Sequence, residues 1–264
     1  AEELGYTQAN ITMQIKALEE ELRLPLFDRI NRQIFLTQHG EDLLPYAKSI
    51  LAMEQQAAAQ LSRAGIPHGT LRIGVYQAIG EAFLPAILAA YHRQFPEVAL
   101  IVKTGTLEML SALLNSDALD LIWIFEREIE SGDWDKQMNF LHQVMLFCGS
   151  GHRPANTVLS AEELAGHSFL LGEKSCAYRN LLEREMALRN TKPQISMEID
   201  NPGTILSIAV SSGEFAFLPL FLAQDALDSG QITALSVPGF ESFLCSQIFT
   251  HKDMPFPAAK GIMA

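Results

Sequence analysis

The chain has no apolar run approaching the roughly 18 to 20 residues that a membrane-spanning helix requires, and no basic-then-apolar leader opens it. These absences predict a cytoplasmic protein with no membrane partner. The three cysteines, Cys148, Cys176 and Cys245, are an odd number without C-x-x-C spacing, which argues against a disulfide framework and a zinc site. The seven histidines form no His-Glu-x-x-His pair, so no metal site is expected.

Signatures of catalysis are also lacking. Gly149-Ser150-Gly151 is not a nucleophile elbow, because that motif needs glycine two positions on either side of the serine. The chain contains no phosphate-binding loop, no glycine-rich dinucleotide turn after a strand and no paired-carboxylate signature. The sequence therefore predicts no catalytic residue, no cofactor and no enzyme.

What the chain does have is length and an acidic balance. At 264 residues, of which 48% are hydrophobic, it can bury more than one core. The net charge of -12 divides unevenly: residues 1–64 carry six Lys and Arg against nine Asp and Glu, and residues 65–264 carry thirteen against twenty-two. Because repulsion from distant acids is screened beyond about 8 to 10 Å, basic residues near the N-terminus can still bind a polyanion locally.

Residues 4–19 predict two helices joined by a tight turn. Gly5 ends the first helix, Thr7 is the N-cap of the second, and Ile11 and Ile15 recur at helical spacing. The opposite face is polar, and its amide side chains can pair with base edges in a DNA groove. A solvated helix face has the same pattern, so the helix-turn-helix needs support from its surroundings. The residues predicted to face DNA are Thr7, Gln8, Asn10, Thr12, Met13 and Lys16.

Residues 26–37 provide that support, because they predict two short strands around an Asn-containing turn. A hairpin beside a recognition helix is a wing. Arg29 and Arg32, near its tip, are placed to hold phosphates or to enter the minor groove. Ordinary surface charge is the alternative explanation for both arginines.

Three segments of this region together resemble the N-terminal signature of the LysR-type transcriptional regulators: Thr7 to Leu22, Pro25 to Arg29 and Leu36 to Gly40. The resemblance implies an α/β protein with an N-terminal winged helix-turn-helix and a long linker helix. It further implies a bilobal effector domain of the type 2 periplasmic-binding-protein kind.

Two positions depart from the family's pattern. Ala9 and Met13 stand where the family usually has proline and arginine, and Met13 can offer DNA only an apolar contact, as to a thymine methyl. The resemblance also implies that a first helix and the start of the second precede Ala1, so the winged helix-turn-helix is N-terminally incomplete in this chain.

Residues 41–63 predict one long helix rich in Ala, Leu and Gln. Its apolar residues alternate spacings of three and four, which is a heptad seam that calls for a partner helix. Packing of this helix on its own domain is the alternative, whereas the LysR resemblance implies a dimer. The seam residues assigned to dimerisation are Leu44, Ala47, Leu51, Ala58 and Leu61.

After a hinge at residues 64–69, strands and helices alternate, which predicts two α/β subdomains. The first has strands at 71–76, 98–104 and 119–125 and helices at 82–95 and 107–115. The second has strands at 169–171, 195–199 and 215–218 and helices at 178–189 and 203–211, and a strand at 242–251 returns to the first. The predicted domains are 1–40, the winged helix-turn-helix; 41–64, the linker helix; and 65–264, the effector domain, divided into about 69–142 plus 243–264 and about 143–242.

Open α/β sheets bind ligands beyond the carboxyl ends of their strands, where helix N-termini offer free N–H groups. The loops at those positions are predicted to converge on one cleft between the subdomains. Thr104, Thr106, Ser175 and Asn201 are each better explained alone as helix caps, so their convergence carries the prediction. The predicted effector-binding residues are Tyr76, Gln77, Thr104, Thr106, Phe125, Glu126, Ser175, Arg179, Asn201 and Phe217.

Three residues bear on the chemistry of the effector. Arg179 can pair bidentately with a carboxylate, which favours an anionic effector, unless it is a solvated helix residue. Glu126 in the opposite loop favours an amine or a hydroxyl-rich ligand. Cys176, at a predicted helix N-terminus, is a candidate oxidant sensor with a lowered pKa, although it has no obvious resolving partner; Cys148 is expected in a buried strand.

The leading hypothesis is a regulator that binds a pseudo-palindromic double-stranded DNA operator as a homodimer or homotetramer. A small-molecule effector in the cleft would bias its geometry, and RNA polymerase is a further candidate partner. A free solute-binding protein would need an export leader and no basic wing. An enzyme on the same bilobal scaffold would need an acid–base pair in the cleft.

Overall fold

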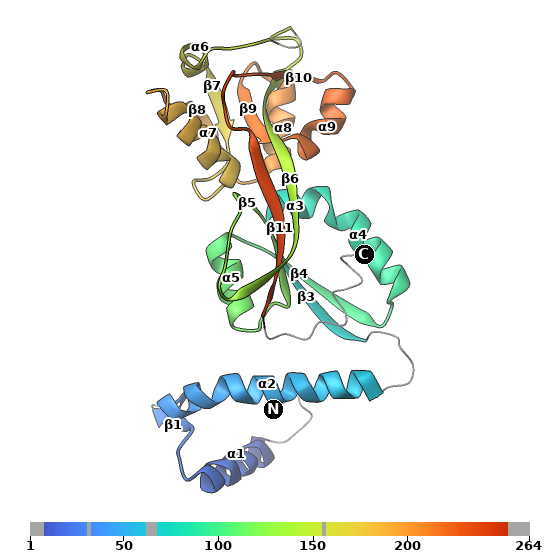
Figure 1. The fold of residues 1–264 in the computed structure, drawn as a ribbon, viewed down its shortest axis with the longest axis vertical. Helices are drawn as coiled ribbons and strands as arrows, with labels where there is room; N and C mark the ends of the chain where they lie inside the picture. The colour runs from blue at the N-terminus through green and yellow to red at the C-terminus, as the bar shows by residue number, and fades with distance from the viewer. Residues whose placement is uncertain (1–7, 31–32, 62–67, 155–156, 253–264) are drawn as a thin grey trace. The chain divides into compact units, whose positions relative to one another are not determined.

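The computed structural model describes residues 8–30, 33–61, 68–154 and 157–252, and the chain divides into two compact units, Ala1–Gly65 and Ile66–Ala264 (Figure 1). The first is called the N-terminal unit and the second the C-terminal unit. None of the described helices combines the length and the apolarity needed to span a bilayer.

The N-terminal unit contains a helix, a two-stranded hairpin and a long helix. These are α1 (Gln8–Leu22), β1 (Phe27–Ile30), β2 (Gln33–Leu36) and α2 (Gln38–Leu61). The two strands pair antiparallel, from Phe27 opposite Leu36 to Ile30 opposite Gln33. The predicted second helix, wing strands and long helix are therefore confirmed.

Local hydrogen bonds fix the hairpin between its helices. Glu19 Oε1 accepts from the backbone N–H groups of Leu26 at 2.7 Å and Phe27 at 3.0 Å, which holds the start of β1 against α1. Thr37 Oγ1 accepts from the N–H of Gly40 at 3.1 Å at the start of α2. A Cβ on Gly40 would collide with the carbonyl oxygen of Leu26, so glycine is required where α2 approaches the hairpin.

The C-terminal unit is built on one nine-stranded sheet with the order β4-β3-β5-β11-β6-β9-β7-β8, and β10 pairs with β6. Its first parallel group is β3 (Gly69–Val75), β4 (Val98–Thr104) and β5 (Leu121–Glu126). Its second is β7 (Ser168–Leu171), β8 (Gln194–Glu198) and β9 (Phe215–Pro219). The strands β6 (Trp134–Gly149), β10 (Ile232–Leu235) and β11 (Phe243–His251) run antiparallel to their neighbours.

Helices accompany each parallel group and define two lobes (Figure 1). Lobe I has α3 (Gln77–Ala82), α4 (Leu84–Gln94) and α5 (Leu107–Asn115) with the first group. Lobe II has α6 (Ala161–Ala165), α7 (Ala177–Ala187), α8 (Pro202–Ser211) and α9 (Leu220–Asp228) with the second group. The predicted alternation of strands and helices is confirmed, and 98–104 and 107–115 agree to the residue. The helix predicted at 82–95 begins later than expected, at Leu84, because the residues before Phe83 form the separate helix α3.

Strand β6 connects the lobes. Its residues 134–143 pair with β11, and its residues 144–147 pair with β9, so one strand contributes to both lobes. Figure 1 shows β6 and β11 running side by side from one lobe to the other. The sequence prediction gave no range for β6, although it expected Cys148 in a strand, and it did not include α6, α9 or β10. The predicted return of the tail to the first subdomain is confirmed by the pairing of β11 with β5.

Candidate functional site

A cavity of about 270 Å³ opens between the lobes of the C-terminal unit. It lies beyond the carboxyl ends of β3, β4 and β5, where the helices α3, α5, α7 and α8 begin. From lobe I it is lined by Tyr76, Gln77, Ala78, Thr104, Gly105, Thr106 and Phe125. From lobe II it is lined by Glu173, Ser175, Cys176, Ala177, Tyr178, Asp200 and Pro202.

The structure brings together more than half of the predicted effector-binding residues. Those that line the cavity are Tyr76, Gln77, Thr104, Thr106, Phe125 and Ser175. Their contact with an effector stays a prediction. Sequence reasoning missed Glu173, Tyr178 and Asp200. Each lies within two residues of a predicted loop, and this closeness in the sequence was the signal that could have found them.

The lobe I wall contains a half-buried polar pair. The Tyr76 hydroxyl donates to Glu126 Oε1 at 2.9 Å, which places Glu126 behind Tyr76 and outside the cavity lining. Burial and then the charge of Glu126 raise the pKa of the Tyr76 hydroxyl far above its usual value. Burial also raises the pKa of the Glu126 carboxyl, against the opposing effect of the Tyr76 hydrogen bond. Tyr76 therefore remains a neutral hydrogen-bonding group at the cavity wall.

Arg179 requires a correction, because its guanidinium is used inside the protein. The side chain is 3% exposed and does not line the cavity. Its Nη1 donates to the Gly172 carbonyl at 2.7 Å and to Glu198 Oε2 at 2.6 Å, and its Nε donates to Glu183 Oε1 at 2.8 Å. Because its guanidinium already donates to these three acceptors, Arg179 is not available to bind a carboxylate ligand. The argument for an anionic effector loses its basis.

Asn201 and Phe217 also have structural roles. Asn201 Oδ1 accepts from the N–H of Thr204 at 2.7 Å as the N-cap of α8, and its Nδ2 donates to Glu81 Oε1 on α3 at 2.7 Å, which joins the two lobes. Phe217 is 3% exposed in β9, opposite Leu146. Neither residue lines the cavity. Thr106 caps α5 as well, yet it does reach the cavity.

The prediction of a lowered pKa at Cys176 is wrong. The thiol is partly buried at the start of α7, and burial raises its pKa to about 11. Such a thiol is protonated near neutral pH and lacks the thiolate that reacts with oxidants. Cys148 lies buried in β6, as expected.

On the N-terminal unit, part of the predicted DNA-reading face lies on α1 and is described. Thr12, Met13 and Lys16 are exposed there, and Asn10 is half-buried. The Nζ atom of Lys16 lies 3.9 Å from Oε1 of Glu20. The residues Thr7 and Arg32, and the side chains of Gln8 and Arg29, lie outside the described residues.

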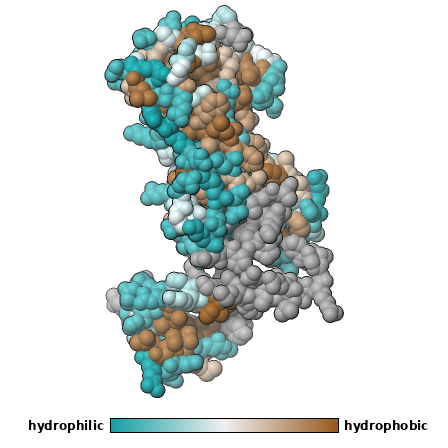
Figure 2. All heavy atoms as spheres, in the orientation of Figure 1, coloured by the Kyte–Doolittle hydropathy of each residue, from teal (hydrophilic) through white to brown (hydrophobic). Residues whose placement is uncertain are grey.

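The predicted dimer seam is partly described on α2. Leu44 and Leu51 are 42% and 60% exposed, and Ala47 is half-buried. The side chains of Ala58 and Leu61 lie outside the described part. Figure 2 shows apolar surface on the N-terminal unit, where Leu18, Leu22, Leu24, Ile34 and Phe35 are also exposed.

Two family models match the chain. Residues 64–261 match the LysR substrate binding domain, and residues 1–41 match the bacterial regulatory helix-turn-helix protein, lysR family. The chain belongs to the LysR family. As a LysR-type transcriptional regulator, it carries a DNA-binding helix-turn-helix and an effector-binding domain.

Known proteins agree with this assignment. The chain is similar to YwqM of Bacillus subtilis (strain 168), named an uncharacterized HTH-type transcriptional regulator, with 26% identity over 255 residues that cover 96% of this chain and 86% of the relative. It is 28% identical to GltR of the same strain, an HTH-type transcriptional regulator, over 95% of this chain and 83% of the relative. These relatives are named as regulators, not as enzymes.

Solved structures support the fold. A variant of full-length OxyR from Pseudomonas aeruginosa superposes with a TM-score of 0.72 at 23% identity, over 100% of this chain and 86% of that one. Full-length CbnR complexed with its target DNA gives a TM-score of 0.59 at 17% identity, over 100% and 90%. The LysR regulator therefore has the α/β fold with a winged helix-turn-helix and a periplasmic-binding-protein-like domain.

Proposed function

We propose that this LysR-type regulator reads an operator through α1 and the β1–β2 wing, and that a small molecule in the interlobe cavity controls that binding. One observation carries the proposal: the cavity is lined by both lobes. A ligand there touches Phe125 of lobe I and Asp200 of lobe II at once. It therefore binds one arrangement of the lobes better than another, which is the differential affinity that a shift in population requires.

For DNA, we assign base reading to the polar face of α1 and phosphate contacts to the wing. The exposure of Thr12, Met13 and Lys16 on α1 supports this assignment. For assembly, we assign the α2 seam to a homodimer, supported by the exposed Leu44 and Leu51. An apolar helical stripe facing water gains free energy when a partner helix covers it, and a dimer also doubles the phosphate contacts.

A gel-shift experiment tests the proposal. The full-length protein at low salt is expected to retard DNA from upstream of its own gene, and the retardation should weaken steeply as salt rises, because counterions are released on binding. A cavity ligand is expected to change the affinity or the mobility of the complex. Absence of retardation at low salt, with and without ligands, would contradict the proposal that this protein binds such an operator.

Two substitutions are expected to separate positioning from reading. Arg32→Ala should weaken binding to all sequences alike and reduce the salt slope by about one, because it removes a phosphate contact. Gln8→Ala should cost about 1 to 3 kcal/mol at one base pair and relax the choice there. Anisotropy titrations against a panel of operator variants measure both effects. Lys103→Ala, an exposed lysine of the C-terminal unit, is the matched control and should change neither.

A further inference from the structure

The charged side chains that line the cavity are all acidic. They are Glu173 and Asp200, both exposed on the lobe II side. Among the described residues, the Asp200 carboxylate has no hydrogen bond or ion pair, and Glu173 accepts from Ser175 through Oε1. The cavity therefore presents carboxylate oxygens to a ligand, and its lining has no lysine, arginine or histidine to oppose them.

The residues around the cavity carry both signs: Glu126 and Glu81 of lobe I are acidic, whereas Lys174 of lobe II, exposed between Glu173 and Ser175 but outside the lining, is basic. Glu126 lies behind Tyr76, and Glu81 accepts from Gln77 Nε2 at 3.0 Å. The nearby Arg179 is neutralised by its own two carboxylates. Carboxylates in a cleft with low-dielectric walls focus a negative potential, which raises the local concentration of cations.

Helix N-termini do not reverse the sign. Thr106 accepts from one N–H of α5, that of Met109, and Asn201 accepts from one N–H of α8, that of Thr204, while α3 has only six residues. Only α7, of the four helices that begin at the cavity, has eight or more residues and no side-chain cap hydrogen bond. The N-terminal ends of α5, α7 and α8 are each equivalent to about half an elementary positive charge, so together they remain below the two negative charges of Glu173 and Asp200.

The complementary cation is organic. The described residues contain no group of three or more His, Cys, Asp or Glu side chains that could hold a metal ion. The rings of Tyr76, Phe125 and Tyr178 line the cavity instead, and aromatic rings attract ammonium groups and bury apolar surface. An ammonium group with an apolar body satisfies the carboxylates and the rings together.

We infer that the effector of this cavity is a small, positively charged organic amine whose ammonium group binds at Asp200 and Glu173. The inference rests on the proposed function, in which the cavity holds the effector. It replaces the anionic effector that Arg179 suggested, and it rests on Glu173 and Asp200, because Glu126 does not line the cavity either.

Calorimetric titration of the full-length protein with two matched sets of probes tests the inference. The sets are benzylamine, benzyl alcohol and benzoate, and butylamine, butanol and butyrate. At neutral pH and low salt, the amine of at least one set is expected to bind about tenfold or more tightly than its alcohol, because a hydrogen bond to a charged group is stronger than a neutral one. Raising the salt concentration should lower the affinity for the amine and leave the affinity for the uncharged alcohol unchanged.

Substitution locates the binding. Asp200→Asn should lower the affinity for that amine about tenfold and leave the affinity for its alcohol unchanged. Asp225→Asn, an exposed acid on α9 that does not line the cavity, is the matched control and should change neither. If Asp200→Asn lowers the melting temperature, Glu173→Gln is the second variant, with the same expected selectivity.

The inference is overturned if, in both sets, the alcohol or the carboxylate binds as tightly as the amine, or if no amine binds. It is also overturned if an amine binds equally to the wild-type protein and to both acidic-to-amide variants. Tight binding of a carboxylate would leave the proposed regulator intact with a different effector class. Loss of DNA retardation would contradict the proposed regulator whatever the titrations show.

Discussion

Arg179→Met is expected to lower the free energy of unfolding by about 3 kcal/mol while leaving the amine affinity of the cavity unchanged. The guanidinium is buried and bonded to the Gly172 carbonyl and to Glu183 and Glu198. Methionine keeps most of the apolar stem but removes every donor. The buried carbonyl of Gly172 then loses its partner, which costs about 1 to 3 kcal/mol.

The exposure of Glu183 and Glu198, the ion-pair partners of Arg179, determines how much more stability the substitution removes. Breaking a fully buried ion pair costs about 3 to 5 kcal/mol, because an unpaired charge stays in the interior. Here the side chains of Glu183 and Glu198 are 39% and 48% exposed, so water can solvate them after the substitution. The expected total therefore lies at the low end of that range. Urea denaturation followed by circular dichroism measures it.

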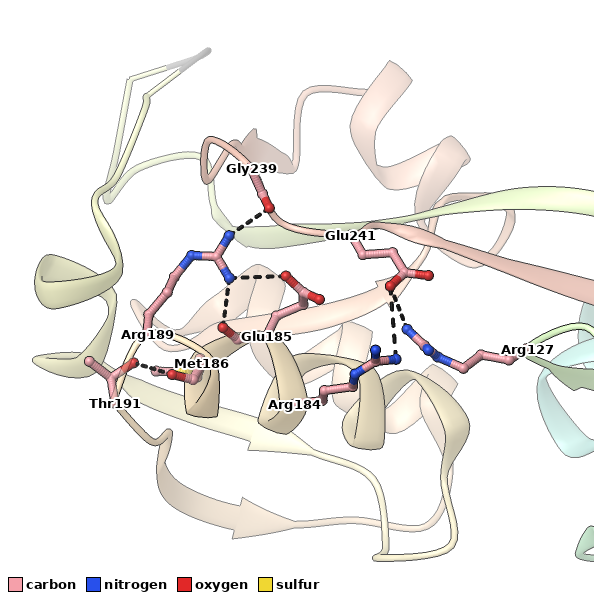
Figure 3. A network of polar contacts seen from close by, with 8 residues as sticks. All are labelled: Arg127, Arg184, Glu185, Met186, Arg189, Thr191, Gly239 and Glu241. Atoms are coloured by element: carbon pink, nitrogen blue, oxygen red, sulfur yellow. Dashed lines mark hydrogen bonds and ion pairs between the residues drawn. The ribbon is translucent and has the colours of Figure 1, made fainter.

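Arg184→Met on the same helix is the matched control. Arg184 is 51% exposed and lies 4.0 Å from Glu241, which Arg127 also contacts (Figure 3). Exposed pairs of this kind contribute at most about 1 kcal/mol, so this substitution should change stability little. If Arg179→Met kept its stability and instead abolished ligand binding, Arg179 would be an effector contact after all.

The parallel strands and the cavity loops could be predicted because their signals are local. The strand at 98–104 and the helix at 107–115 have clear patterns, and the carboxyl ends of parallel strands lie on one edge by geometry. Tyr76, Thr104 and Phe125 could therefore be placed at one cavity without knowledge of their contacts.

What the sequence could not provide was the partner of each charged group. Arg179 has the residue type and position of an anion contact, but Glu198, 19 residues away on strand β8, forms an ion pair with it. Cys176 begins a helix, yet burial by the surrounding lobe determines its pKa. The first half of strand β6 was missed for a similar reason, because it is largely polar and its pairing depends on β11, about a hundred residues later.

Phe249→Ala is expected to lower the free energy of unfolding by about 3 to 5 kcal/mol, the largest single effect that we predict. Phe249 is 1% exposed on β11, in a core with Leu110, Leu114 and Ile122. Its ring centroid lies 5.6 Å from that of Trp134. Alanine removes the ring and leaves a void. Because β11 is paired with β5 on one side and with β6 on the other, its backbone cannot move to fill that void.

Tryptophan fluorescence can follow this loss, because the two tryptophans of the chain, Trp123 and Trp134, lie on β5 and β6 beside β11. Phe243→Ala is the matched control on the same strand. Phe243 is 44% exposed, so its truncation should cost less than about 1 kcal/mol. Equal losses for both variants, or an unchanged denaturation midpoint for Phe249→Ala, would mean that β11 does not complete the core of lobe I. The same strand also supports the lobe I wall of the cavity, since Phe125 pairs with Ser246 of β11.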